Sequence, residues 1–286
     1  MEPDLPLAPA PDQLDARLPD ALAREPEVAL LHEAAVEAGE IARAHFERGV
    51  RHWHKDDASP VTEADVAVDR FLRERLTAAR PDHGWLSEET VDAPDRLGRR
   101  HVFVVDPIDG TRGFLDGNDA WVVSVALVTD GRPRAGVLVR PMTGEIFTAA
   151  AGLGAFRGRE RLSIPDRTGL SGARVAGPRR LRTHPPAIEA GLDVVPFIPS
   201  LALRLAMVST GDLDVVLTFG GSSDWDLAAA ELVVQEAGGA VETVVGPPLA
   251  YNRRTVAQPS LIAAGPGLVP AVRAIAEGLP LRRTVG

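Results

Sequence analysis

The sequence is organised around Asp106-Pro107-Ile108-Asp109-Gly110-Thr111, which follows an apolar run over residues 101–105. The run predicts a buried strand, so the two carboxylates leave the core together at its end. Burying an unpaired carboxylate costs several kcal/mol, so such a pair usually faces water, a cation or a basic partner. Clustered carboxylate oxygens suit Mg²⁺ or Ca²⁺ better than zinc. Taken alone, the stretch is equally consistent with a strand that ends in a polar turn.

The residues between and after the two carboxylates predict a sharp change of direction. Pro107 favours an extended conformation at the residue before it and removes a backbone donor. Gly110 permits a left-handed turn, and Thr111 could cap the element that follows. The motif therefore joins a strand end to a new element.

Length and composition restrict the class of protein. The chain has 286 residues, 45% hydrophobic and 25% charged, which is typical of a globular protein with one large domain or two lobes. The net charge of −9 argues against binding to polymeric nucleic acid, although Mg²⁺ and arginines can still attract a small phosphorylated ligand. The absence of cysteine excludes disulfides, thiolate zinc sites and a cysteine phosphatase.

The sequence predicts neither a transmembrane helix nor a secretory signal peptide. No apolar run approaches the roughly 20 residues of a membrane span. The first residues are acidic and proline-rich, unlike a secretory signal. We therefore expect residues 1–26 to be a loosely ordered extension and the protein to be cytoplasmic.

Hydrophobic periodicity predicts alternating helices and strands, which indicates a layered α/β fold. Two lobes are expected, residues 27–160 with Glu88 and the central motif and residues 161–286 with Asp226. The expected helices cover residues 28–50, 63–80, 201–209, 225–237 and 269–277. The expected strands cover residues 121–128, 135–139, 145–148, 173–176, 214–219 and 261–264.

Other acidic residues occur where strands end or helices begin. Glu88 and Glu89 follow a short apolar step, Asp65 lies three residues after a good N-cap, Thr62, and Asp226 opens a helix. Each has an ordinary interpretation as a solvated loop residue, a capping residue or a partner of the helix dipole.

Together the motifs resemble the inositol monophosphatase superfamily of Mg²⁺-dependent, lithium-sensitive phosphatases. They occur in family order over about residues 28–275, which implies a two-lobed αβαβα sandwich with the metals at the junction of the lobes. One departure is Ser87, where many members have glycine, and it is expected to be harmless. The motifs are Pro60-Val61-Thr62-x-Ala64-Asp65, Ser87-Glu88-Glu89, the central stretch 106–111, Trp225-Asp226-x-Ala228-Ala229 and Glu236-Ala237-Gly238-Gly239.

The resemblance implies a set of metal ligands. Glu88, Asp106 and the carbonyl of Ile108 would bind a first Mg²⁺. Asp106, Asp109 and Asp226 would bind a second. A third, weaker ion near Glu88 is also allowed by the resemblance, with Glu89 in its outer sphere.

The resemblance also implies catalytic and phosphate-binding roles. Thr111, paired with Asp65, would orient and help deprotonate the attacking water, and Glu88 would share in catalysis. The amides of Gly110 and Thr111 would hold the phosphate, and Asp226 would also touch the substrate. A pair of metal ions suits phosphate ester hydrolysis because it activates water and neutralises the phosphate charge.

The edges of the motifs favour one branch of the family, the 3′(2′),5′-bisphosphate nucleotidases, which convert 3′-phosphoadenosine 5′-phosphate to AMP. Phe219 stands seven positions before Asp226, where inositol monophosphatases usually have an acidic residue. Arg112 after the central threonine and Arg204 in a helix also resemble that branch, as does Pro248-Leu249-x-Tyr251-Asn252. A cation such as Arg204 could bind a second phosphate.

Several alternatives stay open. Phe219 could belong to the core and Arg204 could be a solvated helix residue. Arg179, Arg180 and Arg182 could line the mouth of the site or simply be solvated. An inositol-1-phosphate phosphatase or a histidinol-phosphatase is the alternative activity, and a non-catalytic protein that binds a phosphorylated ligand is a remote one. Members commonly dimerise, so a homodimer is also allowed.

Overall fold

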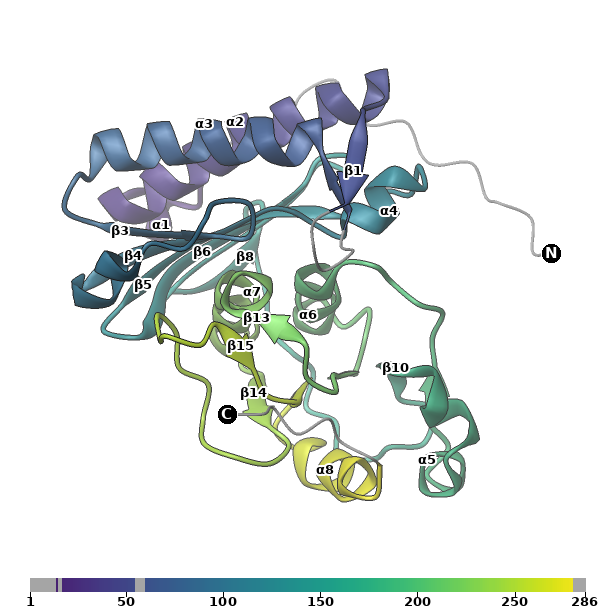
Figure 1. The fold of residues 1–286 in the computed structure, drawn as a ribbon. Helices are drawn as coiled ribbons and strands as arrows, with labels where there is room; N and C mark the ends of the chain where they lie inside the picture. The colour runs from purple at the N-terminus through teal and green to yellow at the C-terminus, as the bar shows by residue number, and fades with distance from the viewer. Residues whose placement is uncertain (1–13, 15–16, 55–59, 280–286) are drawn as a thin grey trace.

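The computed structural model describes residue 14 and residues 17–54 and 60–279, and it arranges them in five layers. In Figure 1 long helices cover one face of a large sheet, further helices lie between this sheet and a smaller one, and others lie beyond the smaller sheet. The expected αβαβα sandwich is therefore confirmed. In layer order the helices are α2 (Pro26–Arg48) and α3 (Glu63–Ala79), then α6 (Leu201–Ser209) and α7 (Asp224–Glu236), then α5 (Pro185–Glu189) and α8 (Val269–Glu277).

The large sheet has seven strands in the order β3-β4-β5-β6-β7-β8-β9. Its first two strands are parallel and the others pair antiparallel. Its strands β4, β5 and β6 are almost wholly buried because helices pack on both faces, so their sequences are continuous apolar runs. The strands are β3 (Gly84–Ser87), β4 (His101–Asp109), β5 (Val122–Thr129), β6 (Arg132–Arg140), β7 (Glu145–Ala150), β8 (Gly154–Arg157) and β9 (Glu160–Arg161).

The smaller sheet has five strands in the order β11-β10-β12-β16-β14. Two small sheets of two strands each, β1–β2 and β13–β15, lie at the starts of α3 and α7. Two 3₁₀ helices, η1 and η2, occupy segments between strands and helices. Their bounds are β1 (His52–His54), β2 (Pro60–Thr62), η1 (Pro94–Gly98), β10 (Arg174–Ala176), η2 (Arg179–Thr183), β11 (Asp193–Val194), β12 (Val215–Leu217), β13 (Ser222–Ser223), β14 (Ala240–Thr243), β15 (Ala257–Gln258) and β16 (Leu261–Ala264).

The smaller sheet with α5, α6, α7 and α8 is called the smaller lobe below, and one apolar cluster joins it to the large sheet. It contains residues of the large sheet, both central helices α6 and α7, and strands of the smaller sheet. Separate clusters lie under α2 and α3 and under α5 and α8. Because α7 is buried on nearly all sides, it fixes the distance between the two sheets. None of the described helices is long and apolar enough to cross a membrane.

The expectation of a loosely ordered segment up to residue 26 is wrong for its described part. Residues 20–23 form a short helix, α1 (Asp20–Ala23), whose Leu22 is fully buried. Leu14 is 8% exposed, and its amide donates to Glu40 Oε1 at 3.0 Å. Burying a leucine contributes about 1.5–3 kcal/mol, which outweighs the low helix propensity of a proline-rich stretch. Residues 1–13 and 15–16 lie outside the described part of the chain.

Candidate active site

A β-bulge brings the two aspartates of the central motif to the same side of the sheet. Residues three apart on a regular strand face opposite sides. In the β4–β5 pair, however, Asp106 lies opposite Ser124 and Asp109 lies opposite Val122, so three steps on β4 match two on β5. The extra residue of the bulge reverses the alternation. The amide of Ile108 donates to Asp106 Oδ1 at 3.0 Å within the bulge.

Parallel pairing of β3 with β4 places Glu88 next to Asp106. Ser87, the last residue of β3, is in register with Val105. The amide of Glu88 continues the ladder and donates to the Val105 carbonyl at 3.2 Å. The two strands therefore deliver their acidic residues to the same edge of the sheet.

The other two acidic residues occupy equivalent positions in two helices. Asp65 is the third residue of α3 and forms a capping box with Thr62, in which Thr62 N donates to Asp65 Oδ2 at 2.8 Å. Asp226 is the third residue of α7 and forms a capping box with Ser223, whose amide donates to Asp226 Oδ2 at 2.6 Å. The cap fixes Oδ2 of each carboxylate. Oδ1 of Asp65 lies 3.4 Å from the Thr111 hydroxyl.

The structure brings Asp106, Asp109 and Asp226 together, with one oxygen of each within 4.8 Å of the others. Burial raises the pKa of Asp106 well above its ordinary value, and the nearby charges of Glu88 and Asp109 raise it further. Burial likewise raises the pKa of Asp226 well above its ordinary value, with Asp109 as the next cause. Glu88 lies outside the 4.8 Å group but is close enough to act on both.

This carboxylate group fits a divalent cation. Two of the three carboxylates are buried and that of Asp226 is half-buried. Carboxylates so placed repel one another and are stabilised when a cation lies between them. The donors are all oxygens, which suits Mg²⁺ or Ca²⁺ rather than a soft metal. It is the one group of its kind among the described residues.

Thr111 lies between the metal ligands and Asp65. Its hydroxyl is 3.0 Å from the Ile108 carbonyl and 3.4 Å from Asp65 Oδ1. Thr111 is the first residue of a short helix, α4 (Thr111–Leu115), and does not cap it, because the N-cap is Gly110. Gly110 has φ +101°, and a Cβ there would lie 3.0 Å from the Ala120 carbonyl oxygen. Only glycine fits this position.

The start of α6 holds Asp109, a contact that sequence reasoning missed. Ser200 Oγ donates to Asp109 Oδ2 at 2.6 Å, and Ala202 N donates to the same oxygen at 2.5 Å. Burial raises the pKa of Asp109, and these donors lower it in part. The N-cap position of Ser200 could be predicted from the sequence, but its partner in the other lobe could not.

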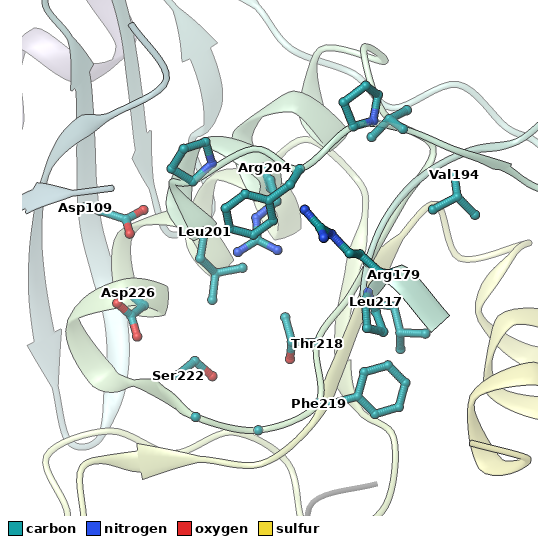
Figure 2. Close-up of a pocket in the computed structure, with 18 of the residues that line it drawn as sticks. Asp109, Arg179, Val194, Leu201, Arg204, Leu217, Thr218, Phe219, Ser222 and Asp226 are labelled. Carbon is teal, nitrogen blue, oxygen red and sulfur yellow. The ribbon is translucent and has the colours of Figure 1, made fainter. Parts of the chain in front are cut away.

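A cavity of about 920 Å³ extends from Asp109 and Asp226 into the smaller lobe. Figure 2 shows the two aspartates at one end, with Arg179 and Arg204 pointing into the space beyond them. Burial lowers the pKa of Arg204, while the charges of the two aspartates raise it. Among the other lining residues are Arg182, Phe197 and Phe219. Phe197 is exposed at 67% and was missed by sequence reasoning.

Of the other residues that the sequence placed near the substrate, some line the cavity and some lie outside it. Phe219 lines the cavity, and its ring also packs against the core cluster of the smaller lobe and beneath the guanidinium of Arg180, 4.2 Å from the ring centre. Arg180 therefore supports the wall without lining it. Arg112 is exposed on α4 and does not line the cavity. Tyr251 is buried, and its hydroxyl donates to Glu231, outside the cavity.

The chain is similar to proteins of known families over most of its length. The model of the inositol monophosphatase family matches residues 24–277. A 3′(2′),5′-bisphosphate nucleotidase CysQ from Aggregatibacter actinomycetemcomitans is 33% identical over 78% of this chain and 86% of its own length. Inositol monophosphatase 2 from Solanum lycopersicum is 34% identical over 79% of this chain and 90% of its own length. A histidinol-phosphatase from Chlorobaculum parvum is 31% identical over 75% of this chain and 84% of its own length.

Solved structures agree with this assignment. The crystal structure of the extragenic suppressor protein suhB from Bartonella henselae superimposes with a TM-score of 0.76 at 29% identity, covering 87% of this chain and 98% of that one. The acidic motifs identified in the sequence thus occur within the matched fold. The chain belongs to the inositol monophosphatase family and is a phosphatase.

Proposed function

We propose that the protein is a Mg²⁺-dependent 3′(2′),5′-bisphosphate nucleotidase that converts 3′-phosphoadenosine 5′-phosphate to AMP. The observation that carries this proposal is that one cavity has a group of carboxylates at one end and a group of arginines on its other walls. Carboxylates for the metal ions lie at one end, and Arg179, Arg182 and Arg204 line the other walls. A substrate with one phosphate at the metals and a second anionic group would match both.

The metal ligands would be Glu88, Asp106, Asp109, Asp226 and the carbonyl of Ile108. When bound, Mg²⁺ would supply a water of lowered pKa and positive charge opposite the phosphate oxygens. A third ion near Glu88 is part of the same proposal. Lithium should inhibit, as the family resemblance implies.

The chain's own groups would orient the attacking water. The Thr111 hydroxyl can accept a hydrogen bond from water while it donates to Asp65 Oδ1 or to the Ile108 carbonyl, which are 3.4 and 3.0 Å away. Asp65 is held by its capping box and so presents Oδ1 to the Thr111 hydroxyl in a fixed direction. The amides of Gly110 and Thr111 would bind the phosphate oxygens at the start of α4.

The second phosphate would bind the arginines of the smaller lobe. The side chain of Arg179 makes no hydrogen bond or ion pair with any described residue, so its donors are available to a ligand. Arg204 is already oriented, because its Nε donates to the Ser200 carbonyl at 3.2 Å. A partly desolvated guanidinium binds a phosphate more strongly than a solvated one. Phe219 would contact the base.

Two monophosphates are the alternative substrates. Inositol 1-phosphate and histidinol phosphate would use the same metals but would leave Arg179 unpaired. Phe219 also offers no acceptor to a sugar hydroxyl. The acidic ligands and Thr111 are all present, so no observation favours a protein that only binds a phosphorylated ligand.

The test is phosphate release from 3′-phosphoadenosine 5′-phosphate, inositol 1-phosphate and histidinol phosphate, with Mg²⁺ and with or without lithium. The proposal expects the nucleotide to have the highest kcat/KM, and Arg204→Ala to lose most of that preference. A preference for either monophosphate would show the branch assignment to be wrong, while the metal site could still stand.

A further inference from the structure

A second buried aspartate of α3 lies behind the site. Asp69 follows Asp65 by four residues, so both carboxylates lie on the same face of the helix, one turn apart. Asp69 is 8% exposed and is not a member of the carboxylate group of the metal site. It has no place in the mechanism described above.

The partners of Asp69 are two hydroxyls that flank Glu88 and Glu89. Ser87 Oγ donates to Asp69 Oδ1 at 2.5 Å, and Thr90 Oγ1 donates to Asp69 Oδ2 at 2.6 Å. An ionised carboxylate only accepts hydrogen bonds, so it fixes the direction of both hydroxyls. Each oxygen of Asp69 thus holds one end of the turn.

Each hydroxyl in turn accepts a hydrogen bond from the same segment. The amide of Glu89 donates to Ser87 Oγ at 3.3 Å, and Trp85 Nε1 donates to Thr90 Oγ1 at 3.2 Å. These chains of hydrogen bonds all end on Asp69. They run from the last strand residues of β3 through the turn, so the whole segment around Glu88 is tied to α3.

We propose that Asp69 is a positioning residue that holds the carboxylate of Glu88 toward the metal ions. The proposal rests on the proposed role of Glu88 as a metal ligand. Ser87 supplies a hydroxyl that the glycine of many family members lacks, and this hydroxyl is one of the two anchors to Asp69. Helix α3 then positions both ends of the site, Thr111 through Asp65 and Glu88 through Asp69.

Partners that orient a metal ligand typically change metal affinity about 10–100-fold when they are removed. Asp69→Ala should therefore raise the Kd for Mg²⁺ by about this factor, measured by calorimetry on the metal-free protein. Thr90→Val should raise it about 3–10-fold, because one of the two anchors remains. Thr90→Ser keeps the hydroxyl and is the matched control, with a Kd within about twofold of wild type.

A second readout separates positioning from a general structural role. The Mg²⁺ concentration for half-maximal phosphate release should rise in step with the Kd, while KM for substrate at saturating Mg²⁺ stays near the wild-type value. If Asp69→Ala fails to fold, Thr90→Val and Ser87→Ala still test the proposal. Wild-type Mg²⁺ affinity in both of these variants would overturn it.

Glu88→Gln supplies the reference that distinguishes the two proposals. If Glu88→Gln weakens Mg²⁺ binding and Asp69→Ala does not, the positioning role is wrong and the metal site stands. If Glu88→Gln binds Mg²⁺ like wild type, Glu88 is not a ligand and both proposals fail at this residue. The expected result is that the double variant binds no more weakly than Glu88→Gln alone, because the two residues act as a unit.

Discussion

The two walls of the cavity are built in different ways. The acidic wall consists of strand ends and capped helix starts, where Asp106 is fixed by a bulge, Asp65 and Asp226 by capping boxes and Asp109 by the start of α6. The arginine wall consists of η2, which carries Arg179 and Arg182, and of α6, which carries Arg204. There the side chain of Arg179 has no hydrogen bond or ion pair with any described residue and Phe197 is 67% exposed.

This difference shows which part of the site can vary. Each of these four aspartates has backbone or hydroxyl donors that belong to the fold itself, so replacing one by a residue without an oxygen acceptor would disturb a sheet end or a helix start. The side chain of Arg179, on the short 3₁₀ helix η2, has no such donors or acceptors among the described residues, so it can change without these effects. Relatives that are similarly identical to this chain accordingly have names that give different substrates. One is named a bisphosphate nucleotidase, one an inositol monophosphatase and one a histidinol-phosphatase.

The largest expected effect comes from breaking the acidic wall with Asp106→Asn. Loss of a shared metal ligand should lower kcat about 1,000-fold or more, since the metals supply several kcal/mol and each 1.4 kcal/mol is about tenfold in rate. Without Mg²⁺ the unfolding temperature should not fall, because the change removes a repelling charge. Asp166→Asn, on the exposed surface, is the control. Phosphate release within tenfold of wild type would contradict the assignment.

The charge of the acidic wall also predicts how stability depends on pH. The raised pKa of Asp106 and of Asp226 means that the folded state binds more protons than the unfolded state. The extra bound protons contribute to the free energy of unfolding. This contribution is fully present below the ordinary pKa of 3.8 and is lost as the pH rises through the folded-state pKa. The metal-free protein should therefore be less stable at about pH 8 than at about pH 5.

Added Mg²⁺ should have the opposite dependence, because it binds the deprotonated carboxylates. At 100 times its Kd it should contribute about 2.7 kcal/mol at pH 8 and less at pH 5. Thermal melts at both pH values, with and without Mg²⁺, measure this. These carboxylates do not form the metal site if Mg²⁺ raises the melting temperature equally at both pH values. The same conclusion follows if the pH dependence of the melting temperature in Asp106→Asn equals that of the wild type.

The arginine wall is tested by Arg179→Ala. A hydrogen bond to a charged group contributes about 1.5–3 kcal/mol, so KM for 3′-phosphoadenosine 5′-phosphate should rise about 10–100-fold with kcat little changed. The KM for inositol 1-phosphate should stay within about threefold, because that substrate has no second phosphate. Arg254→Ala, exposed and outside the cavity lining, is the matched control. Equal losses on both substrates would mean that Arg179 does not distinguish them.

The smallest effect is expected from Phe219→Leu, which keeps an apolar side chain in the wall but removes the ring. Stacking on a base is worth about 1–3 kcal/mol, and the ring of Phe219 already contacts Arg180, so a loss near the lower end, about fivefold in KM for the nucleotide, is expected. Inositol 1-phosphate hydrolysis should not change. If both substrates are affected equally, Phe219 acts only as a core residue.

The elements of the fold could be predicted in large part from local sequence. The helices at 201–209 and 269–277 and the strand at 261–264 lie where their periodicity places them. Thr62 and Asp65 form the capping box that their spacing predicts. These features depend on residues a few positions apart, so their physical causes are present in the local sequence. The buried leucines near the N-terminus were missed because their partner surface, α2, lies elsewhere in the chain.

The acidic residues, the layered α/β class and the kind of chemistry follow from the amino-acid sequence alone. Three features required the folded chain: a bulge turns Asp109 to the side of Asp106, Ser200 of the smaller lobe holds Asp109, and Arg179 reaches the cavity while Arg112 does not. The tertiary structure also revealed Asp69 behind Glu88. Each of these depends on the register between strands or on contacts between segments distant in sequence, which local patterns do not encode.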